Sequence, residues 1–164
     1  MRFAKRLALI SFVLVACVGC DRVTKSIAMA VLPNTLPWSL FGDTVRLQVI
    51  YNHGAFLSLG ASLPMVWRQA ILVVGVGCLL AGALTYAFVS KPGHPPVVLA
   101  IALVCAGGIG NLWDRVVHGG MVVDFINIGI GSVRTGIFNV ADIVIVVGVL
   151  MFIANGWQRQ GRAP

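Results

Sequence analysis

The sequence contains no glutamate and only five aspartates, against 12 lysines and arginines. Charged residues make up 10% of the chain and hydrophobic residues 59%, whereas soluble domains carry roughly 25% charged residues. So little charge excludes an ordinary soluble domain. We therefore expect one integral membrane domain over residues 1–164.

The positive charge, formally +7, does not indicate nucleic-acid binding. Lysine and arginine are scattered singly between apolar runs, and no basic stripe with interleaved aromatic residues occurs. Anchoring to anionic lipid and the setting of membrane topology explain the excess better. Membrane lipids are therefore expected partners, and nucleic acid is not.

Potential metal ligands are sparse as well. The three histidines fall in different predicted loops, without HExxH or similar spacing: His53, His94 and His118. The four cysteines all lie in apolar runs: Cys17, Cys20, Cys78 and Cys105. Free cysteine in such runs behaves as a small hydrophobe, so packing is predicted even for the Cys17/Cys20 pair with its redox-like spacing. We expect neither a metal nor a cofactor.

Four apolar runs predict membrane-spanning helices at about residues 5–31, 64–89, 97–114 and 137–157. The start of the first run also looks like a cleavable signal, because residues 14–17 resemble a lipoprotein cleavage box. Its helical character continues past Cys20 and stops only at Pro33, so an uncleaved first helix is favoured. In the third run, the small residues 106–110 predict close helix packing.

The segments between the spans are rich in turn residues. Residues 32–63 contain repeated Pro, Gly and Asn, and residues 44–51 alternate as a strand does. We expect 32–63 to form a small extramembrane β platform on the bilayer, with the aromatic stretch 36–41 at the membrane boundary. The Gly-rich residues 115–136 are predicted to form an extramembrane loop.

The predicted fold class is thus an all-α integral membrane protein, with four transmembrane helices and a small β platform between helices 1 and 2. Four spans place both termini on one side of the membrane. Each side carries six basic residues, but Arg22, Lys25 and Arg115 belong to polar motifs at membrane depth. Setting these three aside leaves six basic residues on the side of the termini and three on the other side. The positive-inside rule then favours cytoplasmic termini.

The few carboxylates are concentrated beside apolar runs near the C-terminus. Asp124 follows Met121–Val123, and Asp142 opens the apolar run 143–153. An acid at the centre of a membrane helix costs roughly 2.5–3.5 kcal/mol on insertion scales. Because groups kept at such a cost usually serve function, Asp124 and Asp142 are the first candidates for a site.

Other polar residues occur at helical spacings near the same helix ends. Asp21 and Lys25 are four residues apart and are expected to pair on one helix face. Asn111, Asp114 and Arg115, at positions i, i+3 and i+4, share a face at the end of the third span. Asp114 and Arg115 are expected to form a structural ion pair.

Asn139 and Asp142 lie three residues apart at the start of the fourth span. The topology puts this helix start, the ends of helices one and three, and the segments carrying Asn52 and Asp124 on the same side. A single polar cluster at one leaflet boundary is therefore predicted.

Three functions are compatible with such a cluster. Two adjacent carboxylates in a low dielectric cannot both ionise, so one keeps a proton while the other acts as a base. Such a dyad can activate water and protonate a leaving amine. The same groups could relay protons in a small four-helix proton-coupled transporter, or could merely lock helices together. Spacing alone leaves these alternatives open.

Five blocks of the sequence, taken in order, resemble those of the lipoprotein signal peptidases, also called signal peptidase II. They are DRVTK at 21–25, YNHGAFLSLG at 51–60, GNLWDR at 110–115, VVDF at 122–125 and FNVAD at 138–142. The resemblance implies a bacterial inner-membrane aspartic endopeptidase with four helices. It would remove signal peptides from prolipoproteins by cutting just before the diacylglyceryl-modified cysteine.

The resemblance also implies roles for single residues. Asp124 and Asp142 would be the catalytic dyad, near the outer leaflet. The residues that position the dyad and the substrate would be Asp21, Lys25, Asn52, Gly54, Asn111, Arg115 and Asn139. A lipidated prolipoprotein is the expected substrate, and the cyclic peptide globomycin an expected inhibitor. The chain departs from the commoner family pattern at two positions. Arg22 stands where Gln is frequent, and the aromatic residue Phe56 comes one position earlier than in the commoner Gly-Ala-Ala-Phe-Ser block.

Overall fold

The computed structural model describes residues 3–33, 36–55, 60, 62–89 and 95–160. Its helices are α1 (Phe3–Val31), α2 (Met65–Gln69), the π-helical turn η2 (Ala70–Gly75), α3 (Val76–Val89), α4 (Pro95–Val117) and α5 (Val140–Gln160). In the described part of the chain, four helical stretches are long and apolar enough to cross a membrane, the second being α2, η2 and α3 in succession. The four predicted spans are confirmed.

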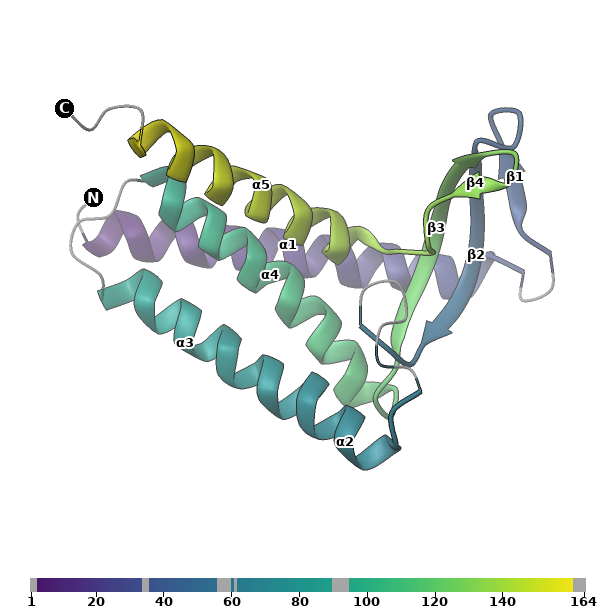
Figure 1. The fold of residues 1–164 in the computed structure, drawn as a ribbon, viewed down its shortest axis with the longest axis horizontal. Coiled ribbons are helices and arrows are strands. Elements are labelled where there is room, and N and C mark those ends of the chain that lie inside the picture. Colours follow the sequence, from purple (N-terminus) through teal and green to yellow (C-terminus); the bar gives the residue numbers. More distant parts are fainter. Residues whose placement is uncertain (1–2, 34–35, 56–59, 61, 90–94, 161–164) are drawn as a thin grey trace.

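The helices form a bundle with a small sheet at one end, while α1 begins and α5 ends at the opposite end (Figure 1). The central helix is α4, which contacts α1, α3 and α5. Half of its apolar window is buried inside the protein, against 11–17% in the other three spans. The rest of the bundle surface is apolar and exposed, as lipid contact requires.

Glycines allow the other helices to approach α4 closely. A Cβ atom at Gly107 would lie 2.4 Å from the Ala141 carbonyl oxygen of α5, and one at Gly108 would lie 2.6 Å from the Leu80 side chain of α3. Gly110 faces α1 in the same way. The close packing predicted for residues 106–110 is confirmed, and it sets the helix spacing around the polar residues beyond.

Two clusters of buried apolar residues hold the helices and the sheet together. The first joins α1, α3 and α4 and consists of Ile10, Val13, Ala87, Val98, Ala102 and Ala106. The second joins the end of α1 to the sheet and consists of Ala28, Val49, Val123 and Phe125. The sheet is therefore attached to the bundle by hydrophobic burial as well as by the chain connections.

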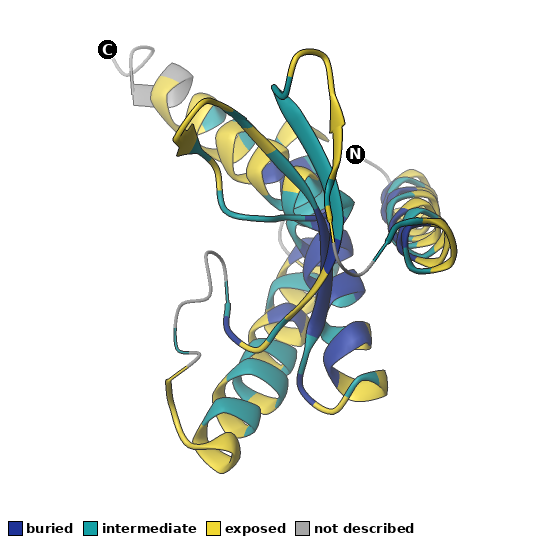
Figure 2. Cartoon of the chain, turned by 90° about the vertical axis from the view of Figure 1, so that its right-hand side faces the viewer, coloured by how far each residue is buried: buried dark blue, intermediate teal, exposed yellow. Residues whose placement is uncertain are grey.

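The sheet is antiparallel, with strand order β1 (Trp38–Leu40), β2 (Val45–Asn52), β3 (Val122–Ile130) and β4 (Val133–Arg134). The strand predicted at 44–51 is confirmed as β2. However, residues 115–136 are not simply a loop, because they supply β3 and β4. The first four residues of β3 are all buried against the helices, whereas the hairpin ends are exposed (Figure 2). A continuous buried run lacks the alternation by which a strand is recognised.

Replacing Gly107 with alanine should destabilise the bundle by about 1–3 kcal/mol, because the added methyl overpacks the α4–α5 contact. Thermal unfolding of the purified protein in detergent measures the loss. Gly82 on α3 is the matched control, since a Cβ atom there meets nothing within 4 Å. Gly82→Ala should leave stability unchanged or raise it slightly. Equal effects of the two substitutions would contradict the packing described.

Candidate active site

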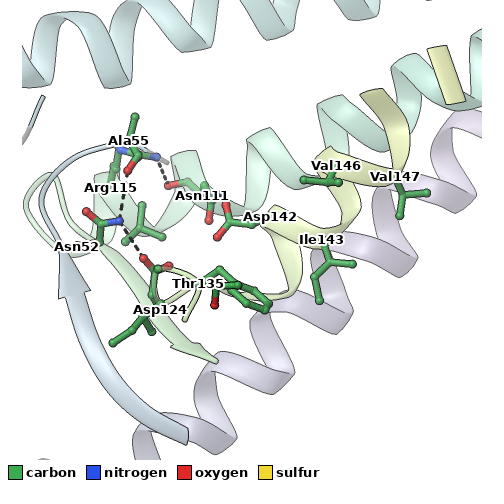
Figure 3. A pocket seen from close by; sticks show the side chains of 14 residues that line it. Asn52, Ala55, Asn111, Arg115, Asp124, Thr135, Asp142, Ile143, Val146 and Val147 are labelled. Carbon is green, nitrogen blue, oxygen red and sulfur yellow. Dashed lines mark hydrogen bonds between the residues drawn. The ribbon is translucent and has the colours of Figure 1, made fainter. Parts of the chain in front are cut away.

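The two predicted catalytic aspartates come from different elements. Asp124 is the third residue of β3, and Asp142 lies in the first turn of α5. Both line one cavity of about 290 Å³. Figure 3 shows the two carboxylates in this cavity, together with the side chains of Asn52, Asn111 and Arg115. Residues remote in the sequence thus meet as predicted.

Asn139 connects the two aspartates. It immediately precedes α5, and its Oδ1 accepts a hydrogen bond from the Asp142 backbone N–H at 3.1 Å. In return, Asp142 Oδ2 accepts one from the Asn139 N–H at 3.1 Å. This reciprocal pattern is a capping box, which satisfies amides left unpaired at a helix start. The Asn139 Nδ2 then donates to Asp124 Oδ1 at 2.7 Å.

Two further asparagines bind the remaining carboxylate oxygens. Asn52 pairs with Val122 across β2 and β3, which places its side chain diagonally beside Asp124. Its Nδ2 donates to Asp124 Oδ2 at 2.9 Å. Asn111 Nδ2 donates to Asp142 Oδ1 at 2.9 Å. Every carboxylate oxygen of the pair therefore accepts a hydrogen bond, so both side chains are fixed in orientation.

Asp21 and Lys25 form the predicted i, i+4 ion pair, with Lys25 Nζ 2.9 Å from Asp21 Oδ2, and both are buried. Lys25 Nζ also donates to Asn111 Oδ1 at 3.1 Å. Asp21 Oδ1 accepts the Ala141 backbone N–H at 3.0 Å, so α1 caps the start of α5. Gly110 makes room for this contact, since a Cβ atom there would lie 2.8 Å from Asp21 Oδ2.

The predicted ion pair between Asp114 and Arg115 is wrong. Asp114 binds the Arg22 guanidinium and Lys25 Nζ, the latter at 2.8 Å. Arg115 turns instead to the cavity, where its Nη2 donates to the Gly54 carbonyl oxygen at 2.9 Å. Adjacent residues on a helix point about 100° apart and do not face each other, which is the physical reason. Arg22 and Asp114 belong to the motifs from which the polar cluster is predicted, but neither is among the predicted site residues.

A second cavity, of about 340 Å³, meets the first at Asn111, Arg115 and Asp142. Its other walls are apolar and include Leu72 of η2 and Val149 of α5. The first cavity likewise extends along apolar residues of α5. The two cavities thus share three polar residues, whereas Asn52 and Asp124 line only the first.

Part of the sequence block at 51–60 lies outside the described residues, namely residues 56–59. Within the block, Gly54 is described, and its backbone N–H donates to Asn52 Oδ1 at 2.9 Å. Among the described residues, no group of three or more His, Cys, Asp or Glu could hold a metal ion. That no metal or cofactor takes part stays a prediction.

The environment of Asp124 favours its protonated form. Burial raises the pKa of this carboxyl to about 6, and the nearby negative charge of Asp142 acts in the same direction. Hydrogen bonds from Asn52 and Asn139 and the charge of Lys25 oppose the rise in pKa without cancelling it. A carboxyl that titrates near neutrality can give and take protons under ordinary conditions.

Comparison with known proteins assigns the family. The family model described as signal peptidase (SPase) II matches residues 13–158. The lipoprotein signal peptidase of Janthinobacterium sp. (strain Marseille) is 34% identical over 117 residues, or 71% of this chain and 69% of that protein. The lipoprotein signal peptidase of Vibrio campbellii is 36% identical over 116 residues, or 70% and 67% respectively.

A solved structure titled as a bacterial membrane enzyme has the same fold, with a TM-score of 0.78 and 24% identity, over 98% of this chain and 92% of that one. The polar cluster and the four spans define a multi-pass membrane protein with a candidate hydrolytic site. The chain belongs to the signal peptidase II family.

The raised pKa of Asp124 predicts a pH-dependent stability. The folded state keeps the proton between pH 3.8, the ordinary pKa, and about 6, so folding stability falls as pH rises through this window. Above it, the ionised Asp124 costs on the order of 3 kcal/mol. Asp124→Asn has no such cost, so its melting temperature should rise relative to the unmodified protein between pH 4 and pH 6.5.

Asp43→Asn is the matched control for this measurement. The hydrogen bonds of Asp43 with Arg46 and Ser39 lower the pKa of its carboxyl, so this exposed group stabilises the fold at neutral pH and loses that effect as pH falls. That loss occurs below pH 3.8, so between pH 4 and pH 6.5 the melting temperature of Asp43→Asn relative to the unmodified protein should stay constant while that of Asp124→Asn rises. Parallel trends would contradict the assignment of a raised pKa to Asp124.

Proposed function

We propose that this chain is an aspartic endopeptidase that removes the signal peptide of diacylglyceryl-modified prolipoproteins, cutting just before the lipidated cysteine. The observation that carries the proposal is that Asp124 and Asp142 line one cavity and are joined by Asn139. Family membership supports the reaction class, since the curated relatives are named lipoprotein signal peptidases. No metal or cofactor is needed in this chemistry.

The dyad acts with one shared proton and one water. Asp124, whose pKa is raised to about 6 by burial, holds the proton, and the carboxylate of Asp142 is the base. Asp142 takes a proton from the water while the water oxygen attacks the scissile carbonyl carbon. At the same time, Asp124 protonates the carbonyl oxygen. On collapse, Asp142 gives its proton to the leaving nitrogen, the C–N bond breaks, and Asp124 regains a proton from the hydroxyl that becomes the new carbonyl.

The shape of the site supports a substrate with two apolar parts. A lipidated prolipoprotein presents a signal helix and a diacylglyceryl group on either side of the bond to be cut. The two cavities, of about 290 and 340 Å³, likewise meet at Asp142 and are walled largely by apolar residues. Both parts of the substrate can then stay in contact with apolar surface while the peptide bond reaches the carboxylates.

The proposed setting is the bacterial inner membrane, with both termini in the cytoplasm and the dyad near the outer leaflet. The helix ends in Figure 1 support this arrangement, because α1 begins and α5 ends at the end of the bundle opposite the sheet and the dyad. The basic-residue count of the loops favours the same orientation. Globomycin is the proposed inhibitor and would occupy the cavity that contains the dyad.

Asp124→Asn and Asp142→Asn should each lower the rate of prolipoprotein cleavage by at least about 10³-fold, because each removes a proton donor or acceptor from both chemical steps. The measurement is cleavage of a diacylglyceryl-modified substrate by purified protein in detergent. It is run with and without a chelator, and full activity in chelator is expected. Asp43→Asn, which removes a carboxylate from the sheet, should cleave normally.

Retained cleavage in both dyad variants would rule out the proposed mechanism. A proton-coupled transporter would instead show pH-driven flux in vesicles that the same two substitutions abolish, with no cleavage by the unmodified protein. Loss of cleavage on chelation would replace the water-activating dyad by a metal. These outcomes separate the alternatives that the sequence leaves open.

Asn52→Ala should move the alkaline limb of the pH–rate profile to higher pH, by about one unit. The active, singly protonated dyad is lost as pH rises through the pKa of Asp124. The Asn52 amide donates to Asp124 Oδ2 and so stabilises the ionised form, which means that its removal raises this pKa. Asn155→Ala is the control, since Asn155 bonds only to a carbonyl oxygen of its own helix in the described structure. A shift to lower pH, or an equal shift in both variants, would contradict the prediction.

A further inference from the structure

Asp114 is a buried carboxylate that the proposed mechanism does not use. It is 0% exposed and lines neither of the two cavities, so it cannot touch a substrate held there. Yet it has three charged or polar partners. Its Oδ1 binds the Arg22 guanidinium, and its Oδ2 accepts from Lys25 Nζ at 2.8 Å and from the Val123 backbone N–H at 3.1 Å.

The bond to Val123 fixes the strand beside the dyad. Val123 immediately precedes Asp124 in β3, and the backbone N–H that follows Asp124, that of Phe125, donates to the Phe138 carbonyl oxygen at 3.0 Å. The backbone around Asp124 is thus held on both sides. Asp114 supplies one of these two anchors from α4, in addition to the pairing of β3 with β2 at Tyr51–Val123 and Ile50–Asp124.

The bond to Lys25 reaches the other half of the dyad. The same Lys25 ammonium group donates to Asn111 Oδ1 at 3.1 Å, which leaves the Asn111 amide group to donate to Asp142 Oδ1 at 2.9 Å. Lys25 and Asn139, whose Nδ2 donates to the same Asn111 oxygen at 3.0 Å, together determine which end of the Asn111 side chain faces the carboxylate. Asp114 in turn shares Lys25 with Asp21, which fixes the ammonium group between two carboxylates.

We propose that Asp114 is a positioning residue for the dyad, holding the β3 backbone beside Asp124 directly and orienting the Asn111 amide toward Asp142 through Lys25. This inference rests on the proposed function, because it concerns the efficiency of that reaction. Asp114 joins α1, α4 and β3 at a single side chain. It therefore couples the placement of the two carboxylates, which come from separate elements.

The charges around the site predict a signature of this role. The charged groups facing the dyad are, from α1, Asp21, Arg22 and Lys25, and from α4, Asp114 and Arg115. The negative charges of Asp21 and Asp114 balance the positive charges of Arg22 and Lys25. Neutralising Asp114 leaves an extra positive charge near the dyad, which favours ionised carboxylates. The alkaline limb of the pH–rate profile should then move to lower pH, opposite to the shift predicted for Asn52→Ala.

The test uses the full-length protein in detergent and the same lipidated substrate. Asp114→Asn keeps the size and one acceptor oxygen, so it should lower kcat by about 10-fold, leave KM unchanged and shift the limb to lower pH. Asp114→Ala also loses the anchor on Val123, and kcat should fall roughly 100-fold, as expected for a small misplacement of catalytic groups.

The double variant Arg22→Gln with Asp114→Asn supplies the rescue. It restores the charge balance, and the Gln carbonyl oxygen can accept from the new amide that would otherwise face the Arg22 guanidinium. The alkaline limb should return toward that of the unmodified protein. Asp43→Asn is the charge-matched control, since it removes one exposed carboxylate of the sheet and should change neither kcat nor the limb.

A merely structural role would lower the melting temperature of Asp114→Asn and leave kcat per folded enzyme and the limb unchanged, and that result would overturn the inference. An alkaline limb of the pH–rate profile that stays at lower pH in the double variant would also overturn the inference. These results are distinguishable from failure of the proposed function itself. In that case Asp124→Asn and Asp142→Asn retain cleavage, whatever the Asp114 variants do.

Discussion

The reciprocal hydrogen bonds between Asn139 and Asp142 are the interaction on which the site depends. A helix start leaves several backbone amides unpaired, and in a membrane protein water is not freely available to satisfy them. The capping box pairs two of these groups, and Asp21 of α1 pairs a third. The same bonds place the carboxylate of Asp142 at the cavity. Secondary-structure capping and the geometry of the aspartate pair are therefore produced by one set of contacts.

Around this helix start, polar groups are buried in matched sets. Lys25 lies between Asp21 and Asp114, and the asparagines at 52, 111 and 139 pair their amides with carboxylate or carbonyl oxygens. Asp124 is incompletely compensated, and burial raises the pKa of its carboxyl. Functional groups are commonly kept in such unfavourable environments, where the loss of stability is the counterpart of reactivity. The glycines of α4 make this density possible by admitting neighbouring helices.

Much of the fold could be predicted from the sequence, because lipid selects for long apolar helices whose bounds are visible in composition. The spacing of Asn139 and Asp142 and of Asp21 with Lys25 likewise indicated contacts within one helix or its cap. What could not be predicted depends on long-range geometry. The buried run at the start of β3 has no alternating pattern, and the partner of Asp114 on α1 is 92 positions away in the chain. Neither the two cavities nor the turning of Arg115 toward them has a local signal.

The sheet brings together strands from two segments that are separated by two membrane spans, with β2 ahead of the second span and β3 after the third. Neither half is long enough to be stable alone. During synthesis, β2 therefore cannot pair until β3 has been made. Asp142 comes to lie beside Asp124 only when α5 has been made. A nascent chain halted at any earlier point holds no paired carboxylates. The newly made protein thus completes the aspartate pair only as the last step of its own insertion.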